Sequence, residues 1–131
     1  MTISFVIPAY NEEAHLAQCL KSIQKEISRS GQSVEIIVVN NASTDKTKEI
    51  ALSFSGVRVV DEISKGLVWA RKDGFEASQG ELIANIDADV LLPEGWLATV
   101  VRAFDHDQQL VALSGPFIYY DLSLSTRGLV K

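Results

Sequence analysis

The sequence predicts a three-layer α/β/α fold built on a mainly parallel β-sheet. Short runs of β-branched residues alternate with longer segments in which apolar residues recur every three or four positions. This alternation is typical of parallel strands, because parallel neighbours need a crossover helix between them. With 131 residues, 47% of them apolar and 22% charged, the chain has the size and composition of one globular domain.

The elements of the first half follow from apolar spacing and from chain breakers. The run 3–7 is apolar and is closed by Pro8, which predicts a buried strand. A helix is expected over 12–28, where one stripe holds Leu16, Leu20, Ile23 and Ile27. Gly31 is expected to end that helix. The run 34–39 is almost wholly β-branched, as expected of a strand covered on both faces.

The second half continues the same pattern. Further strands are expected at 57–60, 82–86, 110–113 and 117–120, and further helices at 46–54, at 66–78 and after Pro93. The helix 66–78 is expected to turn one side to the core, carrying Leu67, Ala70, Phe75 and Ala77. Trp69 and Trp96 are expected to lie at least partly in the core.

Charge and cysteine content limit the classes of function. The chain has 12 basic and 17 acidic residues, a net charge of −5, which argues against a nucleic-acid partner. The single cysteine, Cys19, forms no internal disulfide and favours a reducing, cytoplasmic location. We find neither a signal peptide at the N-terminus nor an apolar run of the roughly 18 residues that span a membrane.

Polar residues follow several of the expected strands, at 8–12, 40–45 and 87–89. In an open parallel sheet these carboxyl ends meet at one edge, where ligands bind. Asp87 and Asp89 alternate with Ala88, so in extended backbone both carboxylates point the same way and repel unless a cation neutralises them. Mg²⁺ or Mn²⁺ suits such oxygen ligands. The alternative is a turn in which the aspartates cap the following helix, and spacing alone does not decide between the two.

Other residues at this edge suit a nucleotide. Tyr10 is placed to form a wall for a flat ring and Glu12 to accept a hydrogen bond, although both also suit a helix start. One of Asn40 and Asn41 is expected in an Asx turn, and the other amide is suited to reading a base edge. Lys65, Arg71, Lys72 and Asp73 form a charged helix start, which is ordinarily a solvated face, although the Arg71 guanidinium suits a diphosphate.

Ordered segments of the chain resemble family 2 glycosyltransferases of the GT-A type. FVIPAYNEE resembles the first strand and nucleotide loop of that family, and VVNNASTDKT resembles its second loop. SKGLVWARKDGFEASQGELIANIDADVLLPEGWL resembles its glycine-arginine helix, the strand with the DXD motif and a proline-led helix. Together these segments cover residues 2–100, and their order makes the resemblance far more specific than a lone DXD.

The resemblance implies a sugar donor linked to UDP or GDP, a saccharide or lipid-linked acceptor and a role in cell-envelope polysaccharide synthesis. It implies inverting transfer, with Mg²⁺ or Mn²⁺ holding the diphosphate. The implied donor-nucleotide residues are Pro8, Ala9, Tyr10, Glu12, Asn40, Asn41, Gly66, Arg71, Asp87 and Ala88. Within this set Asn41 lies near the base edge and Asp87 near the ribose, and Asp89, with Asp87, binds the metal.

The sequence also departs from the family pattern. Asn40 and Asn41 stand where an acidic residue is usual, and Val90 stands where a further acid or polar residue is frequent. No recognisable general-base motif follows Asp89, so the catalytic base is expected beyond residue 131. We therefore expect residues 1–131 to form a single donor-binding domain, incomplete at its C-terminus, of a longer enzyme. That enzyme would be cytoplasmic or attached to the cytoplasmic face of a membrane, and self-association is compatible with the sequence.

Two other functions are compatible with parts of the sequence. The chain could be a module that binds a nucleotide sugar without catalysis, since the base and the acceptor half are missing from it. The segment LIANIDADVLL also resembles the aspartate motif of haloacid-dehalogenase-like phosphatases, but that motif normally lies on the first strand and Leu91 departs from it. A nucleotidyltransferase would normally carry a glycine-rich, basic loop after its first strand, and PAYNEE is neither.

Overall fold

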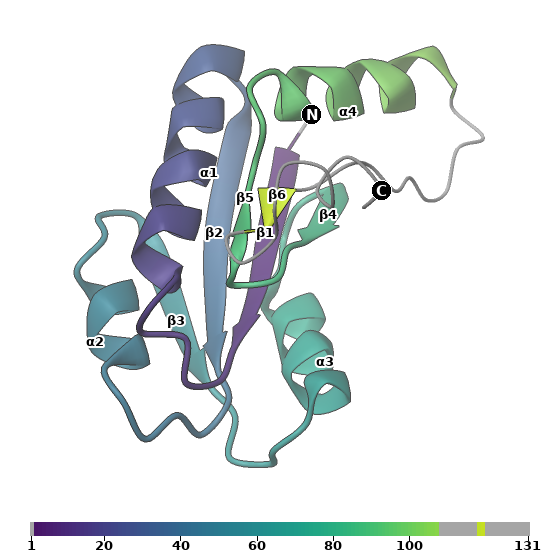
Figure 1. The fold of residues 1–131 in the computed structure, drawn as a ribbon. Coiled ribbons are helices and arrows are strands. Elements are labelled where there is room, and N and C mark those ends of the chain that lie inside the picture. Colours follow the sequence, from purple (N-terminus) through teal and green to yellow (C-terminus); the bar gives the residue numbers. More distant parts are fainter. Residues whose placement is uncertain (1, 108–117, 120–131) are drawn as a thin grey trace.

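A computed structural model describes residues 2–107 and 118–119 of the chain (Figure 1). Its main sheet is wholly parallel and has the strand order β3-β2-β1-β4. The strands are β1 (Thr2–Ala9), β2 (Ser33–Asn40), β3 (Val57–Asp61) and β4 (Leu82–Asn85). Their register places Ala9 opposite Asn40 and Asn40 opposite Asp61. The parallel sheet is thus confirmed, and the ends of β1, β2 and β3 meet at one edge.

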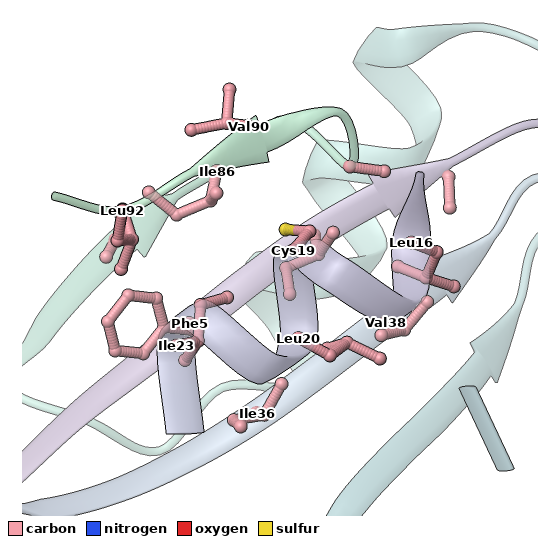
Figure 2. Close-up of a cluster of buried hydrophobic side chains, with 14 of the residues drawn as sticks. Phe5, Leu16, Cys19, Leu20, Ile23, Ile36, Val38, Ile86, Val90 and Leu92 are labelled. Carbon is pink, nitrogen blue, oxygen red and sulfur yellow. The ribbon is translucent and has the colours of Figure 1, made fainter. Parts of the chain in front are cut away.

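The helices cover both faces of this sheet, which confirms the three-layer α/β/α fold (Figure 1). They are α1 (Leu16–Ser30), α2 (Thr47–Leu52), α3 (Leu67–Ala77) and α4 (Trp96–His106). The larger core cluster joins the sheet to α1, α2 and α4 and includes Leu97. Figure 2 shows Phe5 of β1 and Leu20 of α1 within this cluster. The smaller cluster joins the other face to α3. Because β1 and β2 are covered on both faces, they are apolar at nearly every position.

Helix α1 begins at Leu16, the first residue of its apolar stripe and four residues after the start of the expected helix 12–28. After β1 the chain turns through Asn11, whose φ is 50°, and the carbonyl of Glu12 accepts hydrogen bonds from the N–H groups of His15 and Leu16. The first helical turn is therefore replaced by a loop at the sheet edge. At the other end Gly31 has a φ of 67° and closes the helix, as expected.

Helix α3 packs on the sheet through its smallest residues, so the expected apolar side is confirmed for Ala70 and Ala77 and is wrong for Leu67 and Phe75. Ala70 and Gly74 are buried, whereas Leu67, Trp69 and Phe75 are about half exposed or more. A Cβ at Gly74 would overlap Cγ1 of Val6, so the missing side chain is what lets α3 approach β1 this closely. Trp96 is partly buried against Phe5, as expected for a core tryptophan.

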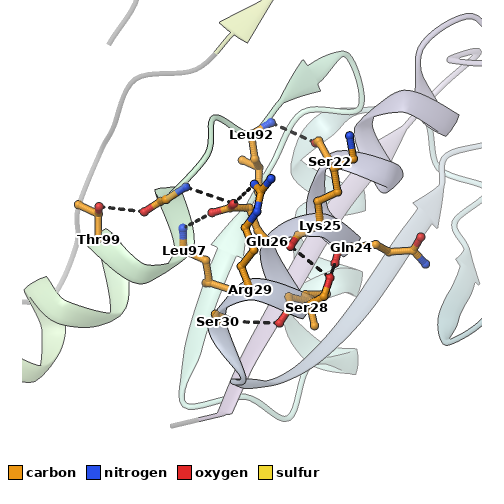
Figure 3. Close-up of polar contacts among 12 residues, drawn as sticks. Ser22, Gln24, Lys25, Glu26, Ser28, Arg29, Ser30, Leu92, Leu97 and Thr99 are labelled. Atoms are coloured by element: carbon orange, nitrogen blue, oxygen red, sulfur yellow. Dashed lines mark hydrogen bonds and ion pairs between the residues drawn. The ribbon is translucent and has the colours of Figure 1, made fainter.

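The segment after β4 is held by successive turns of α1. The Cys19 thiol lies 3.7 Å from the carbonyl oxygen of Asp87, and the Leu92 N–H donates to Ser22 Oγ at 3.1 Å. The buried Glu26 carboxylate accepts from the N–H groups of Gly95, at 3.2 Å, and Leu97, at 2.9 Å (Figure 3). Glu26 thereby satisfies the N-terminal donors of α4.

A second, two-stranded sheet was not expected from the sequence. β5 (Val90–Leu91) pairs antiparallel with β6 (Ile118–Tyr119), which falls within the strand expected at 117–120. The strand expected at 110–113 lies outside the described residues. Helix α4 starts at Trp96, shortly after the proline that was expected to lie in its first turn.

The close contact of α3 with β1 predicts that Gly74→Ala destabilises the protein. We expect the free energy of unfolding to fall by about 2 kcal/mol, because overpacking costs more than the roughly 1 kcal/mol that alanine gains in helix propensity. Urea denaturation would measure this, with Glu76→Ala as an exposed control on the same helix. Unchanged or increased stability of Gly74→Ala would contradict the close packing.

The cap on α4 predicts a graded loss of stability at Glu26. Glu26→Ala should lower the free energy of unfolding by about 2–3 kcal/mol, because it leaves buried N–H donors without a partner. Glu26→Gln should cost less, since its amide oxygen still accepts one hydrogen bond. Thermal denaturation, with the exposed Lys25→Ala on the same helix as the control, would show whether this order holds.

Candidate functional site

The carboxyl ends of β1, β2 and β4 surround a cleft of about 370 Å³. Its walls come from the β1–α1 connection, the residue after β2, the first turns of α3 and the residues after β4. The lining residues are Pro8, Ala9, Tyr10, Glu12, Asn41, Leu67, Ala70, Asp87, Ala88 and Asp89. The sequence places all of these except Leu67 and Ala70 at the site. Leu67 and Ala70 were missed because their spacing was interpreted as a core stripe.

Three other residues expected at the site border the cleft without lining it. Arg71 Nη2 lies 4.0 Å from Asp87 Oδ1. The N–H of Gly66 donates to Asn41 Oδ1 at 2.9 Å. Asn40 lies opposite Ala9 in the register of the sheet. All the residues expected at the site therefore gather at one end of the sheet.

The carboxylates of Asp87 and Asp89 both line the cleft, while Ala88 between them is buried. Neither aspartate is needed to cap the following helix, because Glu26 already accepts from the N–H groups at the start of α4. The segment is nevertheless a turn, closed by the Val90 N–H donating to the Asp87 carbonyl at 3.1 Å, so the extended backbone considered for it is wrong, while its aspartates do not cap α4. Both aspartates line the cleft, and Arg71 lies near the Asp87 carboxylate.

Acidic groups crowd this cleft. Burial raises the pKa of Glu12; a hydrogen bond with His15 opposes this shift, and the charge of Asp89 adds to it. In the described part of the chain no group of three or more His, Cys, Asp or Glu residues is arranged to hold a metal by itself. The pair Asp87 and Asp89 fits a hard divalent ion that completes its shell with water and ligand phosphate, as Mg²⁺ commonly does.

Tyr10 lines the cleft and is about half exposed. Its side chain is 46% exposed, and the Lys65 ammonium lies 5.3 Å from the centre of its ring. The ring is thus available as a stacking surface. Sequence reasoning placed Lys65 only in a charged helix start, because nothing local to it indicates that β1 brings Tyr10 beside it.

The two asparagines are committed to different internal contacts. Asn40 donates to Asp61 at 3.0 Å and accepts from the Ser43 N–H at 3.3 Å, so it makes the expected local turn contact. Asn41 Nδ2 donates to the carbonyls of Glu62, at 3.1 Å, and Ser64, at 2.8 Å. With Asn41 Oδ1 already accepting from Gly66, only one acceptor lone pair of this amide remains unused.

A sequence profile described as "Glycosyl transferase family 2" matches residues 4–129. The chain belongs to glycosyl transferase family 2. Among curated relatives, the putative glycosyltransferase EpsH of Bacillus subtilis (strain 168) is 29% identical over 113 residues, which are 83% of this chain and 32% of EpsH. Membership of this family separates the chain from haloacid-dehalogenase-like phosphatases and agrees with the position of Asp87 after β4, not after the first strand.

Solved structures of the GT-A type share the fold. The crystal structure of S. aureus TarS 1–349 in complex with UDP matches with a TM-score of 0.74 and 20% identity, over 88% of this chain and 39% of TarS 1–349. Glucosyl-3-phosphoglycerate synthase from Mycobacterium tuberculosis, in complex with Mn²⁺, UDP and glucosyl-3-phosphoglycerate, matches with a TM-score of 0.65 and 31% identity. That match covers 79% of this chain and 39% of the synthase.

The chain thus spans about a third of EpsH and about two-fifths of TarS 1–349 and of the mycobacterial synthase. Among the residues that the structure describes, none of the helices has the length and apolar character needed to cross a membrane.

The position of Cys19 behind Asp87 predicts low thiol reactivity. Burial, with a further contribution from the charge of Asp89, raises the pKa of Cys19 to about 12. At pH 8 we expect an aromatic disulfide reagent to modify the native protein at least about a hundred-fold more slowly than the unfolded protein. Similar rates in the two states would show that the contact between α1 and the Asp87 segment is open in solution.

Proposed function

We propose that the cleft binds the nucleoside diphosphate of an activated sugar, for transfer of that sugar to a saccharide or lipid-linked acceptor. The observation that carries this proposal is the convergence of Tyr10, Asp87 and Asp89 on one cleft at the carboxyl edge of a parallel sheet. This is where open α/β sheets bind ligands. Membership of glycosyl transferase family 2 supports the reaction class.

The base and ribose are assigned to the side of the cleft formed by β1 and β2. Pro8, Ala9, Tyr10 and Glu12 line it, and the exposed Tyr10 ring offers the base a stacking surface. Asn41 closes this side, with its remaining lone pair able to accept from a base N–H. Uracil and guanine both carry such a donor, so UDP and GDP are the ligands to compare.

The diphosphate is assigned to the other side, where Asp87 and Asp89 would hold Mg²⁺ or Mn²⁺. When bound, the ion would neutralise the charge that develops on the departing diphosphate. Arg71 lies beside Asp87 and is placed to contact the same phosphates. The presence of Mn²⁺ and UDP in the structure of the mycobacterial synthase supports this assignment.

The proposed chemistry is displacement at the anomeric carbon with inversion. Such a reaction needs a general base that takes the acceptor proton on the face opposite the diphosphate. All the residues assigned above would bind the donor, and we assign no general base among the described residues.

A second candidate function is nucleotide-sugar binding without transfer. It is favoured because all the cleft residues that are given a role above would bind the donor, and none is given a role toward the acceptor. Both candidates require donor binding and differ in turnover. The measurements are therefore nucleotide affinity first, and release of the nucleotide from its sugar second, with candidate acceptors and without them.

Titration calorimetry with UDP and GDP, with and without Mn²⁺, tests donor binding. We expect Asp89→Ala to weaken nucleoside diphosphate binding at least about ten-fold in Mn²⁺ and to leave metal-free binding unchanged, because its role is to hold the metal.

Asp105→Ala on α4, which lies outside the cleft, is the matched control. Equal weakening by Asp89→Ala without metal would refute the role given to Asp89. If the wild-type chain bound neither nucleotide under any condition, both candidate functions would fail. Binding without sugar transfer or hydrolysis would favour the binding module.

A further inference from the structure

Helix α1 borders a second groove, which is separate from the candidate functional site. The groove has a volume of about 430 Å³ and lies between one face of α1 and the residues from Leu91 to Glu94. The N–H of Leu92 donates to Ser22 Oγ at 3.1 Å and so joins its two walls (Figure 3). The described residues that line this groove are all different from those that line the cleft. A ligand of the groove would therefore be held by other side chains than the sugar donor.

The wall formed by α1 carries a row of cations. Lys21, Lys25 and Arg29 follow one another at intervals of four residues, so they lie about one helical turn apart along the same face. All three are exposed. The only acidic residue of α1, Glu26, is 2% exposed and pairs with Arg29 at 3.2 Å while it caps α4. The exposed surface of α1 is therefore positive, although the chain as a whole has a net charge of −5.

The two lysines of this row differ from a lysine in an ordinary ion pair. On α3, the exposed Lys72 pairs with Glu76 one turn away at 3.7 Å. In the part of the chain that the structure describes, neither Lys21 nor Lys25 has a carboxylate partner of this kind. Glu94 is the only acid among the described residues that line the groove. The groove thus keeps a surplus of positive charge that an external anion can neutralise.

The shape of this positive surface favours a plane of charges over a small anion. A site for a small anion needs donors that converge on one point, whereas Lys21 and Lys25 lie side by side on an outer helix of the fold (Figure 1). Lysine carries its charge on a long flexible stem, so both ammonium groups can reach a flat surface together. Leu91 and Pro93 are partly buried and add apolar surface beside these charges. Anionic headgroups above the acyl chains of a membrane match both properties.

Acidic residues elsewhere in the chain do not cancel this attraction. At 0.1 M salt the Debye length is about 10 Å, so a charged surface interacts mainly with the groups closest to it. Near an anionic leaflet each lysine or arginine then contributes about a five-fold gain in affinity. Two unpaired lysines together contribute roughly 25-fold, which is in the range of reversible docking.

We propose that the outer face of α1 docks the protein on a membrane surface that is rich in anionic phospholipids, with Lys21 and Lys25 contacting the lipid phosphates. This inference does not rest on the proposed function. The groove and the cleft are nevertheless close along the chain, because Asp89 lines the cleft and Leu91 lines the groove. Docking through α1 would therefore bring the cleft near a membrane, which is where a lipid-linked acceptor is found.

Sedimentation with phospholipid vesicles tests this docking directly. At 0.1 M salt we expect the chain to bind vesicles that contain phosphatidylglycerol at least about ten-fold more tightly than vesicles of phosphatidylcholine alone. The difference should disappear at 1 M salt, where the Debye length falls to about 3 Å. Soluble glycerol phosphate at millimolar concentration should not compete, because it offers a single phosphate and no surface.

Variants of the groove locate the contact. Lys21→Gln/Lys25→Gln should weaken binding to the anionic vesicles about 25-fold. The matched control is Lys46→Gln/Lys48→Gln, which removes the same charge at the start of α2, outside the groove, and should leave binding nearly unchanged. Glu94→Gln should strengthen binding, because it removes the acid that lines the groove.

Each outcome supports or overturns the proposal. Equal binding to anionic and neutral vesicles, or binding to neither, would overturn it. Similar losses in the two double-lysine variants would show a general effect of net charge and would refute the role of α1. Competition by glycerol phosphate would identify a site for a small anion in place of a membrane surface. All of these results are independent of whether the cleft binds a nucleotide.

Discussion

The parallel pairing of β1 with β2 on one side and β4 on the other is the constraint on which the rest of the structure depends. Parallel neighbours must be joined by crossover helices, and these cover both faces of the sheet. Val6 therefore faces α3 while Phe5 and Ile7 face α1. The same pairing gathers the strand ends at one edge, so the loops after them can form a cleft although they are distant in the sequence.

The sequence predicts well those features that depend on local periodicity and on chain breakers. The β-branched run 34–39 lies within β2, and Gly31 ends α1 as expected. The close packing of α3 on the sheet was not predictable in this way, because it depends on Gly74 having no side chain. The antiparallel pairing of Val90 with Tyr119 joins residues far apart in the chain and has no local signal. The fold class was thus predictable from the sequence pattern. The close approach of α3 to β1 and the pairing of β5 with β6 were not.

The candidate site shows a similar division. That polar residues after β1, β2 and β4 would converge was predictable, because the direction of parallel strands fixes where their ends lie. How each side chain uses its hydrogen bonds was not. An amide at position 41 satisfies two carbonyls and one N–H of the turn 62–66, a task that needs donors as well as an acceptor. The asparagine that stands in place of an acid is therefore matched to the turn beside it.

Three contacts from α1, made by Cys19, Ser22 and Glu26, fix the chain from Asp87 to Leu97 at intervals of about one turn. The conformational entropy of this segment is consequently lost when the protein folds, not when a ligand arrives. The metal binding proposed at Asp87 and Asp89 would then require little further ordering of the backbone, which favours affinity. The two side chains proposed to hold the metal therefore stand on backbone that is already fixed before any metal arrives.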